Sequence, residues 1–483
     1  MKYFYSPLIV FIAAGIVMLA AGGCNKYLDV PLPVNRITGD AAFISDAATS
    51  SVVTGLIQQI SQAGYTAGST GVGYTTALYA DETQNLNPAI LSNALFYANG
   101  LNTSSPSGTT QWTAIYQQLY QVNLAIEKIS SGTGTLSYRN QWLGESYFLR
   151  GYLLWILTNL YGDAPMPLTS NFELNRTIAN SPQASLYSQI IKDLKMAQTL
   201  LTVDYKDGYG AATTDRSRPN QLAVRAMLAR VYLYQQDWAN AEAEATSVIS
   251  AANYQLVPLS QAFLINNKEA VWSFATLTGS TTVVSEYTLY NNAMPAVIPA
   301  GRQLTSYGVN AAMSTDLVNA FEPGDNRLQN WVRQTTVPAT ATAPALTYYF
   351  PNKYKASAVG TEHNVVLRLA EAYLIRAEAR AQQNNLTGGQ DDLNAVRQRA
   401  GLGLLKPASP ELLVAAILKE RRTELFTEFG HRLFDLRRTG TLNTVMNAYA
   451  PVKGGSWSAY KQYWPRPAED LQTNPNIQQT PGY

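Results

Sequence analysis

Three glutamates in the last quarter of the chain are spaced for chemistry that uses paired carboxylates. Glu420, Glu424 and Glu428 stand four residues apart, so on a helix each would lie one turn from the next. Hydrolysis of a glycosidic bond uses two carboxyl groups about 5 to 10 Å apart across the sugar. The same stretch is also rich in arginine, with Arg421, Arg422, Arg432 and Arg437. We interpret the glutamates as ion-pair partners that tie helices together, because carboxylate and guanidinium groups interleaved in this way pair readily.

Few other side chains offer catalytic or metal chemistry. The chain contains two histidines, His363 and His431, and one cysteine, Cys24. A histidine metal cluster, a histidine proton relay and a thiolate metal site are therefore not expected. No cofactor is predicted, and the sequence leaves calcium binding open. Asp81 and Glu82 form a further acidic pair, which would either contact a ligand or brace a loop.

Aromatic residues beside amides indicate a surface for a partly polar ligand. The chain has 30 tyrosines, and a tyrosine combines a flat apolar face with a polar tip. A sugar stacks its C–H face on such a ring, while its hydroxyls need amide, carboxyl or guanidinium partners. Tyr290 and Trp331 are the foremost candidates. The full set of predicted ligand-binding residues is Tyr74, Asp81, Tyr97, Tyr287, Tyr290, Asn291 and Trp331.

Helical periodicity dominates the elements that would position these residues. Apolar side chains recur every three or four residues in segments 112–129, 142–161 and 184–201. Trp112 and Trp142 lie on these stripes, so we expect both in the core. Nearer the N-terminus, Asp40 is expected to cap a helix that runs to about Ile60.

Two segments, 220–250 and 368–401, have the pattern of a tetratricopeptide-like helical hairpin. Each places small residues such as Ala226 and Ala377 where two helices would face each other, which lets the helix axes approach closely. The predicted fold class is mainly α, with such hairpins forming a scaffold. A loop-rich insertion at about 252–361, with a strand near 270–275, is expected to carry the ligand surface.

The N-terminus has the layout of a lipoprotein signal peptide. Residues 8–21 are almost wholly apolar, a run shorter than the roughly 20 residues that span a bilayer as a helix. Gly22 and Gly23 precede Cys24, and this stretch resembles a lipobox, although Ala21 stands where leucine is more usual. The thiol of Cys24 would then carry acyl chains such as palmitate. The predicted organisation is a signal peptide at 1–23, a lipidated tether at 24–37 and one helical domain at 38–483.

Several segments, in order along the chain, resemble the SusD/RagB family of outer-membrane nutrient-binding lipoproteins. They begin with CNKYLD at the predicted lipidation site and end with WPRPAEDLQTNPNIQQTPGY at the last residue. Between these lie segments 112–123, 144–165, 218–238, 365–381, 393–402 and 420–440. Two departures are Thr480, where family members often carry asparagine, and Arg466, where they often carry isoleucine. The resemblance covers the chain from Cys24 onward.

The resemblance implies a helical fold of about four tetratricopeptide-like units at the outer face of the outer membrane. It implies a non-enzymatic role, in which a nutrient is captured and passed to a SusC-like TonB-dependent transporter barrel. We expect a glycan as ligand. A peptide or other non-sugar ligand remains an alternative, and a surface glycoside hydrolase using two carboxylates is a second. Asp325 and Arg327 recur as a pair in the family, which implies a structural role. The formal net charge of +2 gives no indication of nucleic-acid binding.

Overall fold

The computed structural model describes residues 41–104, 107–132, 135–275, 283–292 and 294–483. Cys24, the expected signal peptide and the expected tether lie outside the described residues, as does Asp40. Within the described ranges, no helix is both long enough and apolar enough to cross a membrane.

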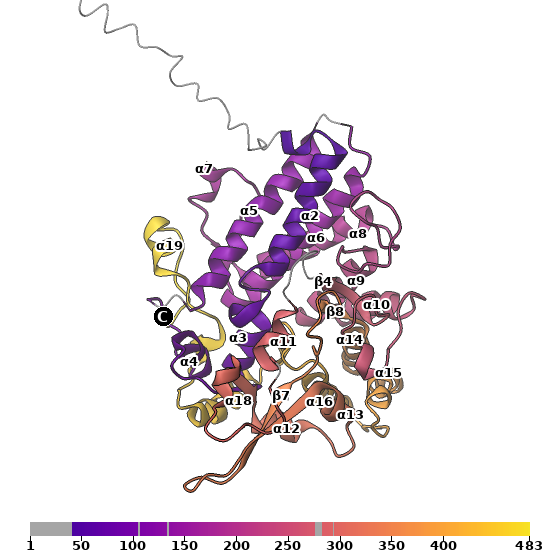
Figure 1. Ribbon diagram of the computed structural model, residues 1–483. Helices are drawn as coiled ribbons and strands as arrows, with labels where there is room; N and C mark the ends of the chain where they lie inside the picture. The colour runs from indigo at the N-terminus through magenta and orange to yellow at the C-terminus, as the bar shows by residue number, and fades with distance from the viewer. Residues whose placement is uncertain (1–40, 105–106, 133–134, 276–282, 293) are drawn as a thin grey trace, which may run out of the picture.

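The body of the protein is a row of helices in which each member packs on the next (Figure 1). Helix α2 (Asp46–Gln62) packs on the first two members of the row. Residues 250–368 separate α10 from α14 in the sequence, although the two helices are neighbours in space. The row runs through α5 (Thr109–Ser131), α6 (Arg139–Tyr161), α8 (Gln183–Leu200), α9 (Gln221–Tyr234), α10 (Trp238–Ile249), α14 (Leu369–Gln382), α15 (Leu386–Arg399) and α16 (Pro410–Glu424).

Side-chain caps determine where several of these helices begin. The side chain of Asn220 accepts a hydrogen bond from the Ala223 N–H at 2.8 Å, which starts α9. Helix α2 begins at Asp46 rather than after Asp40, because the Ser45 hydroxyl accepts a hydrogen bond from the Ala48 N–H at 3.3 Å. Local capping chemistry therefore places the N-cap of the first described α-helix five residues later than the sequence suggests.

The apolar stripes identified in the sequence form the core. Trp112 and Trp142 are buried, as expected. Helix α6 is buried along almost its whole length, and Gly144 lets it approach α8 closely. A Cβ atom on Gly144 would lie 2.8 Å from Leu201 Cγ, closer than side-chain atoms normally pack. This contact fixes the spacing between the two helices.

The two predicted helical hairpins are present. Helices α9 and α10 pack against each other, and so do α14 and α15. Ala229, Ala377 and Ala245 are fully buried in these helices, as small residues at a close helix contact should be. The mainly α-helical scaffold is thus confirmed, whereas the comparison with tetratricopeptide units remains an interpretation.

The insertion predicted as mostly loop contains more regular structure than expected. Strand β4 (Ala270–Phe274) confirms the strand predicted near residue 270, and it pairs with β8 (Asn364–Arg368). Strand β5 (Ala311–Met313) pairs with β1 (Thr83–Asn85), and β6 (Val332–Val337) pairs with β7 (Leu346–Pro351). All of these pairs are antiparallel. The helices of the insertion are α11 (Ser285–Tyr290), α12 (Thr315–Ala320) and α13 (Asn326–Trp331).

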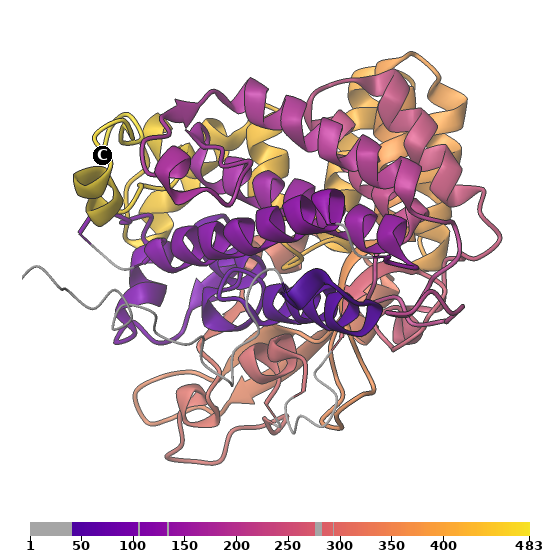
Figure 2. The same ribbon diagram turned by 90° about the horizontal axis from the view of Figure 1, so that it is seen from above.

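The insertion occupies one side of the molecule, with the helical row on the other (Figure 2). The pairing of β5 with β1 ties the insertion to a segment more than 200 residues earlier in the chain. The remaining described α-helices and strands are short: α3 (Val72–Tyr79), α4 (Leu91–Tyr97), β2 (Ala164–Pro165), α7 (Phe172–Asn175), β3 (Asn180–Ser181), α17 (His431–Arg438), α18 (Leu442–Tyr449) and α19 (Ala468–Thr473).

Candidate ligand-binding surfaces

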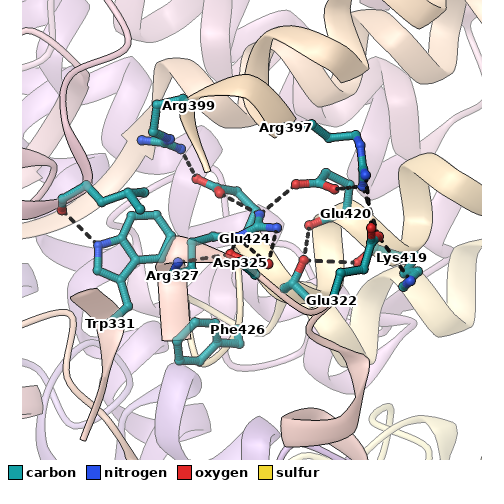
Figure 3. Close-up of polar contacts among 12 residues, drawn as sticks. Glu322, Asp325, Arg327, Trp331, Arg397, Arg399, Lys419, Glu420, Glu424 and Phe426 are labelled. Carbon is teal, nitrogen blue, oxygen red and sulfur yellow. Dashed lines mark hydrogen bonds and ion pairs between the residues drawn. The ribbon is translucent and has the colours of Figure 1, made fainter. Parts of the chain in front are cut away.

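The glutamates that are spaced for paired-carboxylate chemistry lie in a buried ion-pair network, and Figure 3 shows Glu420 and Glu424 within it. Glu424 has no exposed surface, and its carboxylate contacts Arg327 at 3.0 Å, Arg368 at 2.5 Å and also Arg399. Burial acts to raise the pKa of Glu424, but these three guanidinium groups hold that pKa well below its usual range. A carboxylate held in this way has no proton to donate and no access to a substrate.

The neighbouring glutamates are paired as well. Glu420 contacts Arg327 at 2.7 Å and Arg397 at 3.1 Å. Glu428 contacts Lys353 at 2.5 Å and Arg368 at 2.8 Å. The structure therefore supports the interpretation of this segment as ion pairs that join helices, and it offers no open pair of carboxylates here.

Trp331 lies in the interior beside the same network, contrary to the prediction that it contacts a ligand. Its ring is 0% exposed, and its indole N–H donates to the Leu259 carbonyl at 2.8 Å. The cationic groups of Lys353 and Arg399 lie 5.1 and 5.3 Å from its ring centroid. The ring has no free face on which a sugar could stack. The pairing of Asp325 with Arg327, at 2.8 Å, agrees with the structural role implied by the family resemblance.

Tyr290, Tyr74 and Asn291 also lie inside the protein and not on its surface. The rings of Tyr74 and Tyr290 are 5.7 Å apart. The Tyr74 hydroxyl accepts a hydrogen bond from Asn93 at 2.9 Å, and the Asn291 amide donates to the Tyr354 carbonyl at 3.1 Å. The cavity beside Tyr290 measures only about 20 Å³, which is room for about one water molecule. These three side chains cannot contact a glycan without a rearrangement of the surrounding core.

Asp81 braces the loop that follows α3. Its carboxylate contacts Arg432 at 2.7 Å and Arg422 at 2.9 Å, and the side chain is buried. Glu82 is buried beside it and accepts a hydrogen bond from the Thr427 N–H at 3.2 Å. Burial and the neighbouring Asp81 charge raise the pKa of Glu82 to about 7. The structural alternative for this pair is therefore favoured over contact with a ligand.

Tyr97 and Tyr287 are the two of the seven predicted residues that remain half-buried and so reach the surface. Tyr97, on α4, lies with its ring centroid 5.3 Å from Lys453 Nζ. Tyr287, on α11, packs against a buried apolar cluster that includes Phe263 and Trp331. Both can contact solvent, and therefore a ligand, without a change in the core.

A groove that the sequence reasoning missed lies between α5, α7 and α19. It has a volume of about 990 Å³, and Figure 1 shows these helices on the same side of the molecule. Trp112, Tyr116 and Tyr120 of α5 line it, together with Phe172 of α7. The periodicity of segment 112–129 predicts only a core stripe. Tyr120, which repeats the four-residue spacing of Trp112 and Tyr116, is the sequence signal of an aromatic face on this helix.

Metal ligands do not gather anywhere in the described part of the chain. In those ranges, no group of three or more histidine, cysteine, aspartate or glutamate residues is placed to hold a metal ion.

Solved structures share this architecture over nearly their whole length. A SusD superfamily protein from Bacteroides vulgatus superposes with a TM-score of 0.74 at 22% identity, covering 91% of this chain and 99% of the other. A laminarin-binding SusD-like protein superposes with a TM-score of 0.73 at 21% identity, covering 90% of this chain and 99% of the other. Both likenesses concern the fold.

Sequence comparison gives the same family. A SusD-like protein of Formosa agariphila is 25% identical over 422 residues, which is 75% of this chain and 77% of that protein. The starch-binding protein SusD of Bacteroides thetaiotaomicron is 34% identical over 124 residues, which is 24% of this chain and 21% of that protein. A family model described as starch-binding and associating with the outer membrane matches residues 38–233. The SusD family model matches residues 175–483, more than half of the chain, and the protein therefore belongs to the SusD family.

Proposed function

We propose that this protein is a cell-surface lipoprotein that binds a glycan and delivers it to a TonB-dependent transporter barrel in the outer membrane. The observation that carries the proposal is the match to two family models that together span residues 38–483. One of them is described as starch-binding and associating with the outer membrane. The laminarin-binding relative with the same fold supports a glycan as the ligand class.

The state of the carboxylates supports a non-enzymatic role. Glu420, Glu424 and Glu428 are each bound to arginine or lysine in the interior. A glycosidase needs one carboxylic acid that keeps its proton and a second carboxylate with access to the sugar. The paired glutamates meet neither requirement, so binding without cleavage is the function that we propose.

Attachment to the membrane would come from Cys24. Two or three acyl chains give a stable anchor where a single chain gives only reversible binding. Metabolic labelling with a palmitate analogue should mark the wild-type protein and leave the Cys24→Ser variant unmarked. If the variant is labelled as strongly as the wild type, the anchor lies elsewhere. Copurification of a barrel transporter from solubilised outer membranes tests the proposed partner.

Tyr97 and Tyr287 remain proposed ligand contacts, because their rings reach the surface. We propose that the other five predicted residues act indirectly. Tyr74, Tyr290 and Asn291 would support the surface from beneath, and Asp81 and Trp331 would hold the surrounding elements in place.

Affinity electrophoresis tests the ligand class directly. The chain from residue 25 onward would be run through native gels that contain starch, laminarin or other polysaccharides, with serum albumin as a non-binding reference. We expect at least one polysaccharide to retard the protein relative to albumin. Retardation by none of them, together with binding of peptides in solution, would assign the ligand to the peptide class. Release of new reducing ends from the retarding polysaccharide would instead indicate a hydrolase.

A further inference from the structure

We propose that the groove between α5, α7 and α19, called the α5 groove below, is a binding site for a neutral glycan chain. The proposal rests on the function proposed above and gives that function a specific site. The α5 groove is lined by none of the seven residues predicted from the sequence. Its volume of about 990 Å³ is at the upper end of the range for small-molecule sites, which suits several linked sugar rings better than a single one.

Three aromatic rings form a ladder along one side of the α5 groove. Trp112, Tyr116 and Tyr120 stand four residues apart, so their Cα atoms are about 6 Å apart along the helix axis. Their exposure increases along the ladder, from 3% for Trp112 to 49% for Tyr120. Trp112 is too buried to offer a face of its own and packs against Tyr116, so a sugar in the groove would stack on Tyr120 and on the exposed part of Tyr116.

The inner end of the ladder is held in place before any ligand binds. The Tyr116 hydroxyl donates to the Pro165 carbonyl at 2.7 Å. The Trp112 side chain lies beside Asp470 of α19 in the lining of the groove. The Trp112 and Tyr116 ring centroids are 4.7 Å apart. Rings fixed in this way lose little conformational entropy on binding, which favours affinity.

A row of free amides runs beside the rings. Gln117 and Gln121 follow Tyr116 and Tyr120 by one residue each, so the two amides share a neighbouring stripe of α5. No hydrogen bond joins either amide to another residue within the described ranges. An amide offers both donors and acceptors, as sugar hydroxyls require. An apolar peptide face laid over the same groove would leave these two amides without partners, so the lining favours a glycan.

The charges of the α5 groove indicate that the glycan is neutral. Glu173 and Arg176 of the opposite wall pair with each other at 2.7 Å. The remaining charged group of the lining is the Asp470 carboxylate. The lining therefore has no cation left over to bind an acidic sugar or a phosphate, and it carries one carboxylate that would repel either.

Variants of two exposed rings test the proposal with little risk to folding. Tyr120 is 49% exposed and Phe172 is 71% exposed, so replacement of either by alanine leaves the core intact. Tyr209→Ala is the matched control for Tyr120→Ala, because Tyr209 is 50% exposed and lines a different pocket. Leu174→Ala is the control for Phe172→Ala, because Leu174 is 60% exposed on the same short helix and does not line the groove.

The readout is the dissociation constant for starch and for laminarin from affinity gels, with thermal unfolding as the check on folding. We expect Tyr120→Ala and Phe172→Ala each to weaken binding by about tenfold, equivalent to about 1.4 kcal/mol. Both controls should bind like the wild type.

Two results would overturn the proposal. If the wild type binds a polysaccharide and the two groove variants bind it no more weakly than their controls, the site lies elsewhere and the proposed function stands. If the wild type binds neither polysaccharide, the proposed glycan-binding function is wrong, and the assignment of the groove is wrong as well.

Discussion

Arginine–carboxylate pairs account for most of the polar interior around α16. Each charge in this network is out of water, and its desolvation is offset only while its partners are present. Arg368, for example, contacts three carboxylates, those of Glu269, Glu424 and Glu428. The network joins the insertion to α14, α15 and α16, which explains why a segment so rich in charge lies within the fold and not on its surface.

Removal of Glu424 should therefore be costly. Glu424→Ala leaves three arginines without a shared counter-charge in a buried site, and we expect a loss of about 3 to 5 kcal/mol in the free energy of unfolding. The matched control is Glu173→Ala, because Glu173 pairs with Arg176 on the exposed helix α7. The control should change stability by less than about 0.5 kcal/mol. Urea unfolding measures both, and equal effects would contradict the buried-network account.

Glu82 should make stability depend on pH. Its pKa is raised from 4.5 to about 7 in the folded protein by burial and by Asp81. Between these pH values the folded state holds a proton that the unfolded state has lost. The contribution to stability is therefore complete below pH 4.5 and is lost as the pH rises to 7.

The Glu82→Gln variant removes this proton linkage. Relative to wild type, we expect the variant to gain stability as the pH rises from 4.5 to 7. The relative gain should approach about 3 kcal/mol at most. Urea unfolding at a series of pH values gives the difference. A difference that does not change with pH would mean that Glu82 titrates normally in the folded protein.

At the residue scale, the sequence predicts burial correctly for aromatic residues that lie on a periodic apolar stripe. Trp112 and Trp142 sit on apolar stripes and are buried as predicted. Trp331 and Tyr290 lie in a polar, aperiodic stretch, so their types suggested a ligand surface. Their burial depends on distant partners, such as Leu259 and Tyr74, that no local pattern reveals.

At the scale of elements, helix periodicity and capping chemistry account for most of what the sequence predicts. The long helices and the two hairpins follow from apolar spacing and small residues. The strands of the insertion are harder to predict, because a strand such as β5 pairs with β1, a segment more than 200 residues earlier in the sequence. The α5 groove was missed for a related reason, since α7 and α19 join α5 only in the folded protein.

Two helix glycines should respond in opposite ways to the same substitution. A Cβ atom added to Gly55 of α2 would have no described atom within 4 Å. Gly55→Ala should therefore raise stability by about 0.5 to 1 kcal/mol through helix propensity. Gly144→Ala should lower stability by about 1 kcal/mol or more, because its Cβ would overlap Leu201 and press α8 away from α6. Thermal unfolding measures both, and stabilisation by Gly144→Ala would show that the α6–α8 contact is loose.

At the scale of the whole molecule, one helical scaffold would offer more than one proposed contact to a ligand. Tyr97 lies on α4 and Tyr287 on α11, and the N-terminal half of α5 lines the proposed groove. A long polymer that contacts more than one site on the same protein binds more tightly than a short one. A surface protein that captures polysaccharide would gain from this arrangement, because each sugar contact is individually weak.

The measurement that tests surface capture most directly is the binding of fluorescent starch and laminarin to intact cells that produce this protein. We predict that cells with the wild-type protein retain at least one of the labelled polysaccharides. Cells with Cys24→Ser should retain little, although the purified variant should bind the polysaccharide as well as the wild type does. If cells with the wild-type protein retain no more of either polysaccharide than cells without it, the central claim of glycan capture at the cell surface is wrong.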